Sequence, residues 1–185
     1  MEEKFTQDSV RSRLLFSGLK ELEEHGVSDF SLRRVAQDAG VSCAAPYRHF
    51  KDKDELIAAV INFVLEGWTL LSAQISEIFS FDAKTLVTEL AVAGLRFWIA
   101  NGNFRTVIVA ADMLADSQSG SIKEFDRPIA EAVKRYVEES GSVDTDLITF
   151  KILSMLYGAV MLVDGGYESA DRAADNLRTV LQKEL

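Results

Sequence analysis

The segment "FSLRRVAQDAGVSCAAPYRHF", residues 30–50, has the pattern of two short helices joined by a glycine turn. Ser31 can cap the first helix through its hydroxyl, and Val35 provides that helix with an apolar contact. On the second helix, either Tyr47 or Phe50 would be the apolar side chain that sets the crossing angle. A capped helix, a tight turn and a second helix predict a helix-turn-helix.

Pro46 lies where the second helix should be in its first turn. Proline has no backbone N–H and disfavours the helical conformation in the residue before it. In the first three helical positions, however, that N–H has no partner to lose. We therefore predict that the regular helix begins late, near Ala44 or Ala45, after an irregular or tightly wound lead-in at residues 42–44.

Helical periodicity continues on both sides of this segment. Apolar residues three and four apart predict a first helix from about Gln7 to His25, which Gly26 would end in a left-handed conformation. Asp52 and Glu55 form a capping-box pattern that opens one long connecting helix reaching about residue 79.

The remainder of the chain also predicts helices, so the fold is expected to be all-α with about nine of them. Residues 1–54 would form a three-helix domain containing the helix-turn-helix, and the long helix would join it to a helical domain at residues 55–185. After the long helix, the sequence predicts a helix capped by Asp82, a short apolar helix at 104–114 and a loop at 115–121. A capping box of Ser121 and Glu124 opens the next predicted helix, which Pro128 would kink or divide. The final predicted helices lie at about 145–163 and 170–183.

Charge is distributed unevenly along the chain, whose formal net charge is -9. Residues 29–53 hold five cations and three anions, whereas residues 56–185 hold 11 cations and 18 anions. DNA binding requires local positive potential, which only the first of these segments could supply. Imbalances of this size also occur on ordinary soluble surfaces, so charge alone decides nothing.

The sequence predicts a cytoplasmic protein without a membrane partner. No uninterrupted apolar run approaches the roughly 20 residues that span a bilayer, and the first ten residues are polar and acidic. Cys43 is the single cysteine, so no intrachain disulfide can form.

Residues 30–60, "FSLRRVAQDAGVSCAAPYRHFKDKDELIAAV", closely resemble the DNA-binding signature of the TetR family of bacterial transcriptional regulators. The elements "GVS", "YRHF" and "KDEL" fall at that family's spacing, and the resemblance covers about the first third of the chain. It implies a sequence-specific regulator, usually a repressor, that binds a pseudo-palindromic operator in double-stranded DNA as a homodimer. A small-molecule effector would release it from the operator.

The resemblance also implies residue roles on DNA. Tyr47 and Lys53 match positions that contact phosphates, and Ser31 matches a cap that contacts the DNA backbone. Arg33 and Arg48 have the chemistry for bidentate reading of guanine. From periodicity alone, Tyr47 could equally be a core aromatic residue. The complete predicted DNA-binding set is Ser31, Arg33, Cys43, Ala44, Ala45, Tyr47, Arg48, His49 and Lys53.

The second domain carries two predicted surfaces. The resemblance places a dimer interface on the last two helices, where Ile148, Ile152, Met155, Leu156, Ala159, Val160, Val163, Leu177, Val180 and Leu181 supply apolar side chains. A pocket for a largely apolar effector could be lined by Trp68, Phe97, Trp98, Phe104, Phe125, Tyr136 and Tyr157. Residues of either set could instead fill the core of the monomer.

An enzyme is the competing interpretation, and the sequence offers it little. His25 and His49 are the only histidines, and Cys43 has no obvious base partner. We see no phosphate-cradling glycine loop and no metal-ligand cluster, so we expect no catalysis, no metal and no cofactor. A thiol switch at Cys43, and a helical interaction module that does not bind DNA, are the remaining alternatives.

Overall fold

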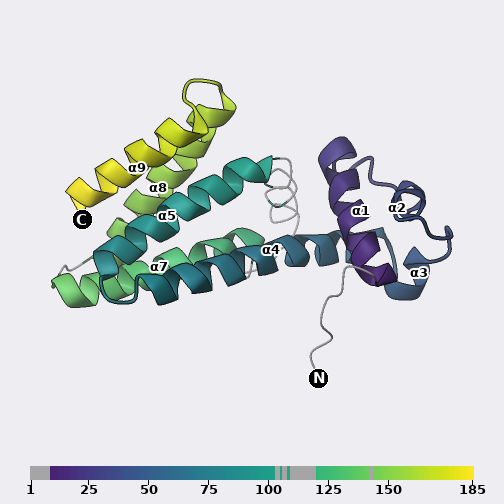
Figure 1. Ribbon diagram of the computed structural model, residues 1–185, viewed down its shortest axis with the longest axis horizontal. Helices are drawn as coiled ribbons and strands as arrows, with labels where there is room; N and C mark the ends of the chain where they lie inside the picture. The colour runs from purple at the N-terminus through teal and green to yellow at the C-terminus, as the bar shows by residue number, and fades with distance from the viewer. Residues whose placement is uncertain (1–8, 103–104, 106–107, 109–119, 142–143) are drawn as a thin grey trace. The chain divides into compact units, whose positions relative to one another are not determined.

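The computed structural model describes residues 9–102, 105, 108, 120–141 and 144–185. In these residues all regular secondary structure is helical, which confirms the predicted all-α fold (Figure 1). The helices are α1 (Val10–His25), α2 (Leu32–Asp38), α3 (Pro46–His49), α4 (Lys53–Ile78), α5 (Ala83–Ala100), α7 (Ser121–Ser140), α8 (Thr145–Asp164) and α9 (Ala170–Glu184).

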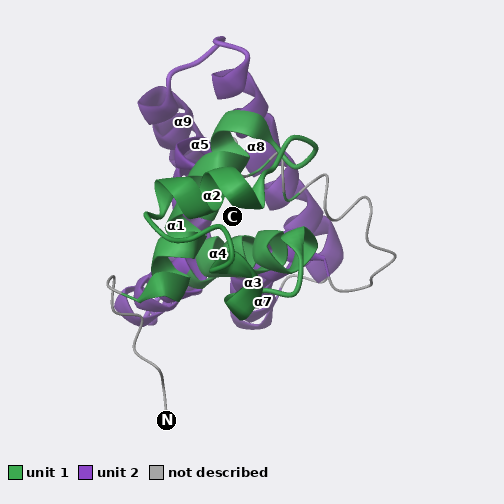
Figure 2. Ribbon diagram, turned by 90° about the vertical axis from the view of Figure 1, so that its right-hand side faces the viewer, with its two compact units in different colours: residues 1–66, 103–117 green, residues 67–102, 118–185 purple. Residues whose placement is uncertain are grey.

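The described residues form two compact units (Figure 2). Unit 1 contains residues 9–66 with 105 and 108, and unit 2 contains residues 67–102, 120–141 and 144–185. The division falls within α4, after Glu66, so the first turns of this helix belong to the unit that holds the helix-turn-helix. The predicted boundary between a DNA-binding domain at residues 1–54 and a second domain at residues 55–185 stays a prediction.

Several helix ends follow the predicted capping rules. The Ser31 hydroxyl accepts the N–H of Arg34, and the Asp52 carboxylate accepts the N–H of Glu55 at 2.9 Å. Asp82 likewise accepts the N–H of Thr85 at 3.1 Å, which opens α5. These caps satisfy N–H groups that have no partner within the helix.

Three local predictions need correction. Gly26 does end α1, and its N–H bonds to Leu22 O at 2.9 Å, but its φ of 69° is combined with a ψ of -178°, which is not left-handed helix. Gly120, not Ser121, occupies the cap position of α7, and no side chain caps that end. Pro128 does not divide α7, which runs from Ser121 to Ser140, and the alternative that it kinks the helix stays a prediction. The predicted start of α1 at Gln7, the predicted helix at 104–114 and the predicted loop at 115–121 lie outside the described residues apart from 105, 108, 120 and 121.

Unit 1 is built on a close approach between α1 and the start of α4. A Cβ atom at Gly18 would lie 2.9 Å from Val60 Cγ2, so only glycine fits at this crossing. Phe16 and Phe63 meet edge to face beside it, with ring centroids 5.1 Å apart. The fold of the first unit therefore depends on a small residue in the middle of α1.

In unit 2, α5 packs against α7, α8 and α9. Its centre is an aromatic cluster in which the Phe125 ring lies 4.5 Å from Trp68 and 4.4 Å from Trp98. The Trp68 indole N–H also donates to the carbonyl of Phe125 at 2.8 Å, in the turn of α7 that precedes Pro128. At the edge of the cluster, the hydroxyl of Tyr157 donates to the carboxylate of Asp126 at 2.7 Å.

Two helices, α4 and α8, are apolar enough to cross a membrane by length and composition, which corrects the expectation that no segment would qualify. That expectation considered apolar runs, whereas the most apolar stretch of each helix contains scattered polar residues and still has a mean hydropathy of 1.7. Core helices of soluble proteins meet the same criterion. The most apolar stretch of α4 is 44% buried within the described protein, but that of α8 is only 17% buried, so α8 leaves apolar surface uncovered.

Replacing Asp126 by asparagine should make the stability of unit 2 less dependent on pH. Burial raises the pKa of Asp126 from 3.8 to about 6, so the folded protein binds this proton more tightly than the unfolded chain does. The resulting stabilisation is complete below about pH 4 and is lost as the pH rises to about 6. Between these limits the D126N protein should gain up to about 3 kcal/mol in unfolding free energy relative to the wild type.

Urea unfolding followed by tryptophan fluorescence measures this difference, because both tryptophans, Trp68 and Trp98, belong to unit 2. The asparagine keeps an oxygen that can accept the Tyr157 hydroxyl, so the variant removes the charge alone. If the unfolding free energies of the wild type and D126N changed in parallel with pH, the expectation would be contradicted.

Candidate nucleic-acid interface

Helix α3 is four residues long and starts at Pro46, which holds the first helical position. The residues before it form a turn in which the Ala45 N–H bonds to Ser42 O at 2.8 Å. The helix closes when the Phe50 N–H bonds to Pro46 O at 2.8 Å. The predicted late start is confirmed, and it falls one residue beyond Ala45.

The side chains of α3 divide cleanly between core and surface. Pro46 and Phe50 are buried, and the guanidinium of Arg11 lies 5.6 Å from the centre of the Phe50 ring. Tyr47 is 61% exposed, so Phe50 is the apolar contact and the core interpretation of Tyr47 is wrong. The helix therefore turns Tyr47 outward together with its two neighbours, Arg48 and His49.

The other predicted DNA-binding residues all belong to unit 1 and keep access to solvent. Arg33, Cys43 and Ala44 are exposed, and Ser31, Ala45 and Lys53 are partly exposed. They lie in the first turn of α2, in the turn before α3 and at the start of α4.

The turn between α2 and α3 depends on Gly40. Its φ of 65° is the left-handed conformation that favours glycine. The Val41 N–H bonds back to Ala36 O at 2.9 Å, and Arg13 from α1 donates to the carbonyl of Ala39 at 3.1 Å. These bonds satisfy the carbonyl groups at the end of α2 and set the direction in which the chain enters α3.

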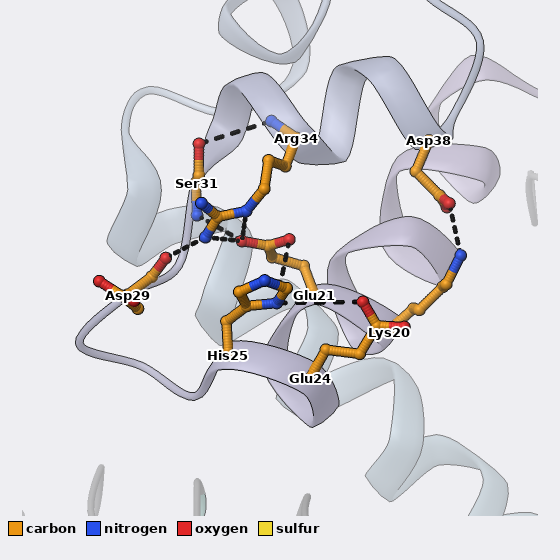
Figure 3. Close-up of polar contacts among 8 residues, drawn as sticks. All are labelled: Lys20, Glu21, Glu24, His25, Asp29, Ser31, Arg34 and Asp38. Carbon is orange, nitrogen blue, oxygen red and sulfur yellow. Dashed lines mark hydrogen bonds and ion pairs between the residues drawn. The ribbon is translucent and has the colours of Figure 1, made fainter.

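A buried carboxylate holds the start of α2 against α1 (Figure 3). Glu21 is only 6% exposed, and its Oε1 accepts the Ser31 N–H at 2.9 Å and the Arg34 Nε–H at 2.8 Å. Arg34 also donates to the carbonyl of Asp29, and His25 Nδ1 lies 3.7 Å from Glu21 Oε2. The network thus links the end of α1, the loop after it and the first turn of α2.

Electrostatics keep this network charged. Burial alone would raise the pKa of Glu21, but the hydrogen bonds from Arg34 and Ser31 outweigh it and hold the pKa below its usual value. This network was not predicted from the sequence. Its signal was the position of Glu21, seven residues after the buried Leu14 and therefore on the same face of α1.

Residues 14–60, which span the whole arrangement from α1 to α4, match the family described as bacterial regulatory proteins, tetR family. The N-terminal segment is a TetR-family domain. This confirms the family resemblance recognised in residues 30–60. The TetR-family domain includes α2, α3, the turn between them and the Glu21 network.

One curated relative is an HTH-type transcriptional regulator of Staphylococcus aureus (strain bovine RF122 / ET3-1). It is 31% identical over 86 residues, which are 45% of this chain and 46% of that protein. The chain thus matches about half the length of the curated relatives.

Solved structures share the fold of the whole chain. A protein of unknown function from Rhodococcus sp. RHA1 has a TM-score of 0.80 at 23% identity, with 100% of this chain and 99% of that chain covered. The Bacillus subtilis regulator FadR in complex with stearoyl-CoA has a TM-score of 0.68 at 12% identity, with 91% and 96% covered. At these identities the likeness shows the fold alone.

The predicted pocket residues that the structure describes lie beyond the TetR-family domain, in unit 2. One cluster of rings that contact each other contains Trp68, Phe97, Trp98, Phe125 and Tyr157. Of these, Trp68, Trp98 and Phe125 are almost fully buried. Tyr136 instead donates its hydroxyl to the carbonyl of Leu185 at the end of the chain. Phe104 lies outside the described residues.

The predicted dimer residues divide into two groups. Within the described protein, those buried in the monomer core are Ile152, Leu156, Val160, Leu177 and Leu181. Those with access to solvent are Ile148, Met155, Ala159, Val163 and Val180. Sequence periodicity did not identify the exposed apolar side chains of Phe150, Met161 and Leu162 on α8, which are 70%, 74% and 51% exposed.

Glu21→Leu should destabilise unit 1. The leucine leaves the Ser31 N–H without its acceptor, and an unsatisfied group of this kind costs about 1–3 kcal/mol. The thermal midpoint followed by circular dichroism should fall, and the Ser31 amide should exchange its hydrogen faster.

Lys20→Ala is the matched control, because it also breaks a bridge between α1 and α2. The Lys20 Nζ lies 2.7 Å from Asp38 Oδ1, but both side chains are largely exposed, so the midpoint should change little. Equal effects of the two substitutions would show that Glu21 has no special part in the domain.

Proposed function

We propose that this chain is a sequence-specific DNA-binding transcriptional regulator, a repressor that binds a pseudo-palindromic operator as a homodimer and is released by a small, largely apolar effector. One observation carries the proposal. Within a TetR-family domain, α3 buries Pro46 and Phe50 and turns Tyr47, Arg48 and His49 outward.

The exposed residues have the chemistry that DNA requires. Tyr47 and Lys53 can donate to phosphate oxygens, which positions the protein without reading sequence. Arg33 and Arg48 can donate two hydrogen bonds to guanine in the major groove. Arg34 is not assigned to DNA, because Glu21 already holds its guanidinium.

A helix of four residues can contact few bases, so one copy would bind weakly and with little selectivity. Two copies related by a two-fold axis would place two such helices about 35 Å apart, one turn of DNA. The proposed dimer contact is the groove between α8 and α9, to which Met155, Leu162 and Val180 contribute. Gly158 lies in the same groove with open space around it, so a partner helix could approach closely.

Unit 2 would bind the effector. FadR, which shares the fold, was solved with stearoyl-CoA, and this supports a small-molecule site in a protein of this architecture. The effector would bind more tightly to a form of the dimer whose recognition helices do not fit the operator. Operator affinity then falls only by the factor with which the effector distinguishes the two forms. The regulator would act in the cytoplasm and use no cofactor or metal.

Selection of bound sequences from a random DNA pool should yield a pseudo-palindrome, and the salt dependence of binding to it should assign the contacts. Lys53→Ala should weaken binding to all sequences alike and reduce the slope of log K against log salt by about 1, because one phosphate contact is lost.

Arg48→Ala should instead relax the preference at particular base pairs, at a cost of about 1–3 kcal/mol for the selected operator. Equal affinity of the wild type for operator and random DNA at every salt concentration would refute the proposed function. It would leave a helical interaction module as the explanation.

Leu162→Glu should convert the dimer into a monomer, because it places a charge in the apolar groove between α8 and α9. Light scattering measures the mass. Phe81→Ser is the control, since it removes an exposed apolar side chain of unit 2 that lies outside both helices, and it should leave the dimer intact. A wild-type protein that is monomeric at micromolar concentration would contradict the proposal.

A further inference from the structure

Asp126 on α7 is a carboxylate in an unusual setting. Among the described residues, its polar partner is the hydroxyl of Tyr157 from α8, at 2.7 Å from Oδ1. Burial raises the pKa of Tyr157, so that hydroxyl keeps its proton and donates. Burial also raises the pKa of Asp126 to about 6, and no cation of the described residues offsets this.

The carboxylate is also accessible. Asp126 lines an open groove of about 510 Å³ between α7 and α8, in which Ala130 and Leu153 provide apolar surface. Lys123, Glu124 and Arg127 line it as well, and Arg127 is already paired with Glu124 at 2.6 Å. The two cations and two carboxylates balance, so the net charge of the groove does not favour an anion.

An ionised carboxylate that is taken out of water without a counter-ion is costly, and a ligand cation that reaches it recovers part of that cost. The Tyr157 hydroxyl links this carboxylate to the aromatic cluster, since the Tyr157 ring lies 6.3 Å from Trp98. Within the groove itself, the aliphatic surface of Ala130 and Leu153 beside one carboxylate suits a molecule with an apolar body and a single positive charge.

We infer that Asp126 and Tyr157 form the recognition site for the protonated nitrogen of an amphipathic amine, whose apolar part packs against Ala130 and Leu153. The nitrogen donates to the Asp126 carboxylate, while the Tyr157 hydroxyl, which donates to Oδ1, holds that carboxylate in place. The inference deepens the proposed function, on which its regulatory meaning rests, by naming the chemical class of the effector.

Three matched probes test it: 4-phenylbutylamine, 4-phenylbutanol and 4-phenylbutyrate, which differ only in the polar end. Both tryptophans of the chain lie in the aromatic cluster, so intrinsic fluorescence reports on this part of unit 2. Near neutral pH the amine should change the fluorescence saturably, with an affinity about tenfold or more above that of the alcohol. The carboxylate should bind more weakly than both.

Asp126→Asn should reduce the affinity for the amine to that for the alcohol, with the alcohol itself unchanged. Glu124→Gln is the control, because it neutralises a more exposed carboxylate in the same groove, and it should preserve the preference for the amine. Equal affinities of the wild type for amine and alcohol, an undiminished preference in D126N, or no saturable change with any probe would each overturn the inference. Equal affinities of the wild type for the amine and the alcohol overturn the inference even where a variant does not fold.

These titrations contain no DNA, so their outcome is separate from that of the proposed function. An amine that binds at Asp126 but leaves operator affinity unchanged would support the site and contradict its role as effector site. Operator binding without any amine binding would overturn the inference and leave the DNA-binding proposal intact.

Discussion

The carboxylate of Glu21 is the interaction on which the arrangement of the TetR-family domain depends. It is buried, yet it accepts hydrogen bonds from the backbone of Ser31 and the side chain of Arg34, so its charge is satisfied inside the protein. Ser31 is the cap of α2, and α2 with its glycine turn sets the entry into α3. One polar contact on α1 therefore fixes the position from which the exposed residues of α3 are presented.

Asp126 in the second unit shows the opposite outcome of the same physics. Burial alone raises the pKa of either carboxylate. For Glu21, an arginine and a backbone N–H reverse that effect, whereas the described part of the chain offers Asp126 a neutral hydroxyl and its pKa stays high. In the first unit, the hydrogen-bonded carboxylate of Glu21 favours one arrangement of α1 and α2. In the second unit, the carboxylate of Asp126 is the place where a positive charge on a ligand would be stabilised.

Much of the fold could be predicted because helix ends are local. The caps at Ser31, Asp52 and Asp82 join groups three residues apart, and the late start of α3 follows from the missing N–H of Pro46. The capping box at Ser121 failed because the same residue types also occur inside a first turn. The Glu21 network could not be derived, because its partners come from a loop and a helix that only the folded chain brings beside α1.

The sequence by itself determined where α2, α4 and α5 begin, that the chain carries a helix-turn-helix, and which residue types are available for the proposed contacts with DNA. The tertiary structure decided that Phe50 packs inside while Tyr47 faces solvent, and that Leu156 fills the core while Leu162 stays exposed. The physical reason is that periodicity defines the faces of a helix but not their partners. Helix α8 is apolar on more than one face, and only packing against α5, α7 and α9 determines which of them is covered.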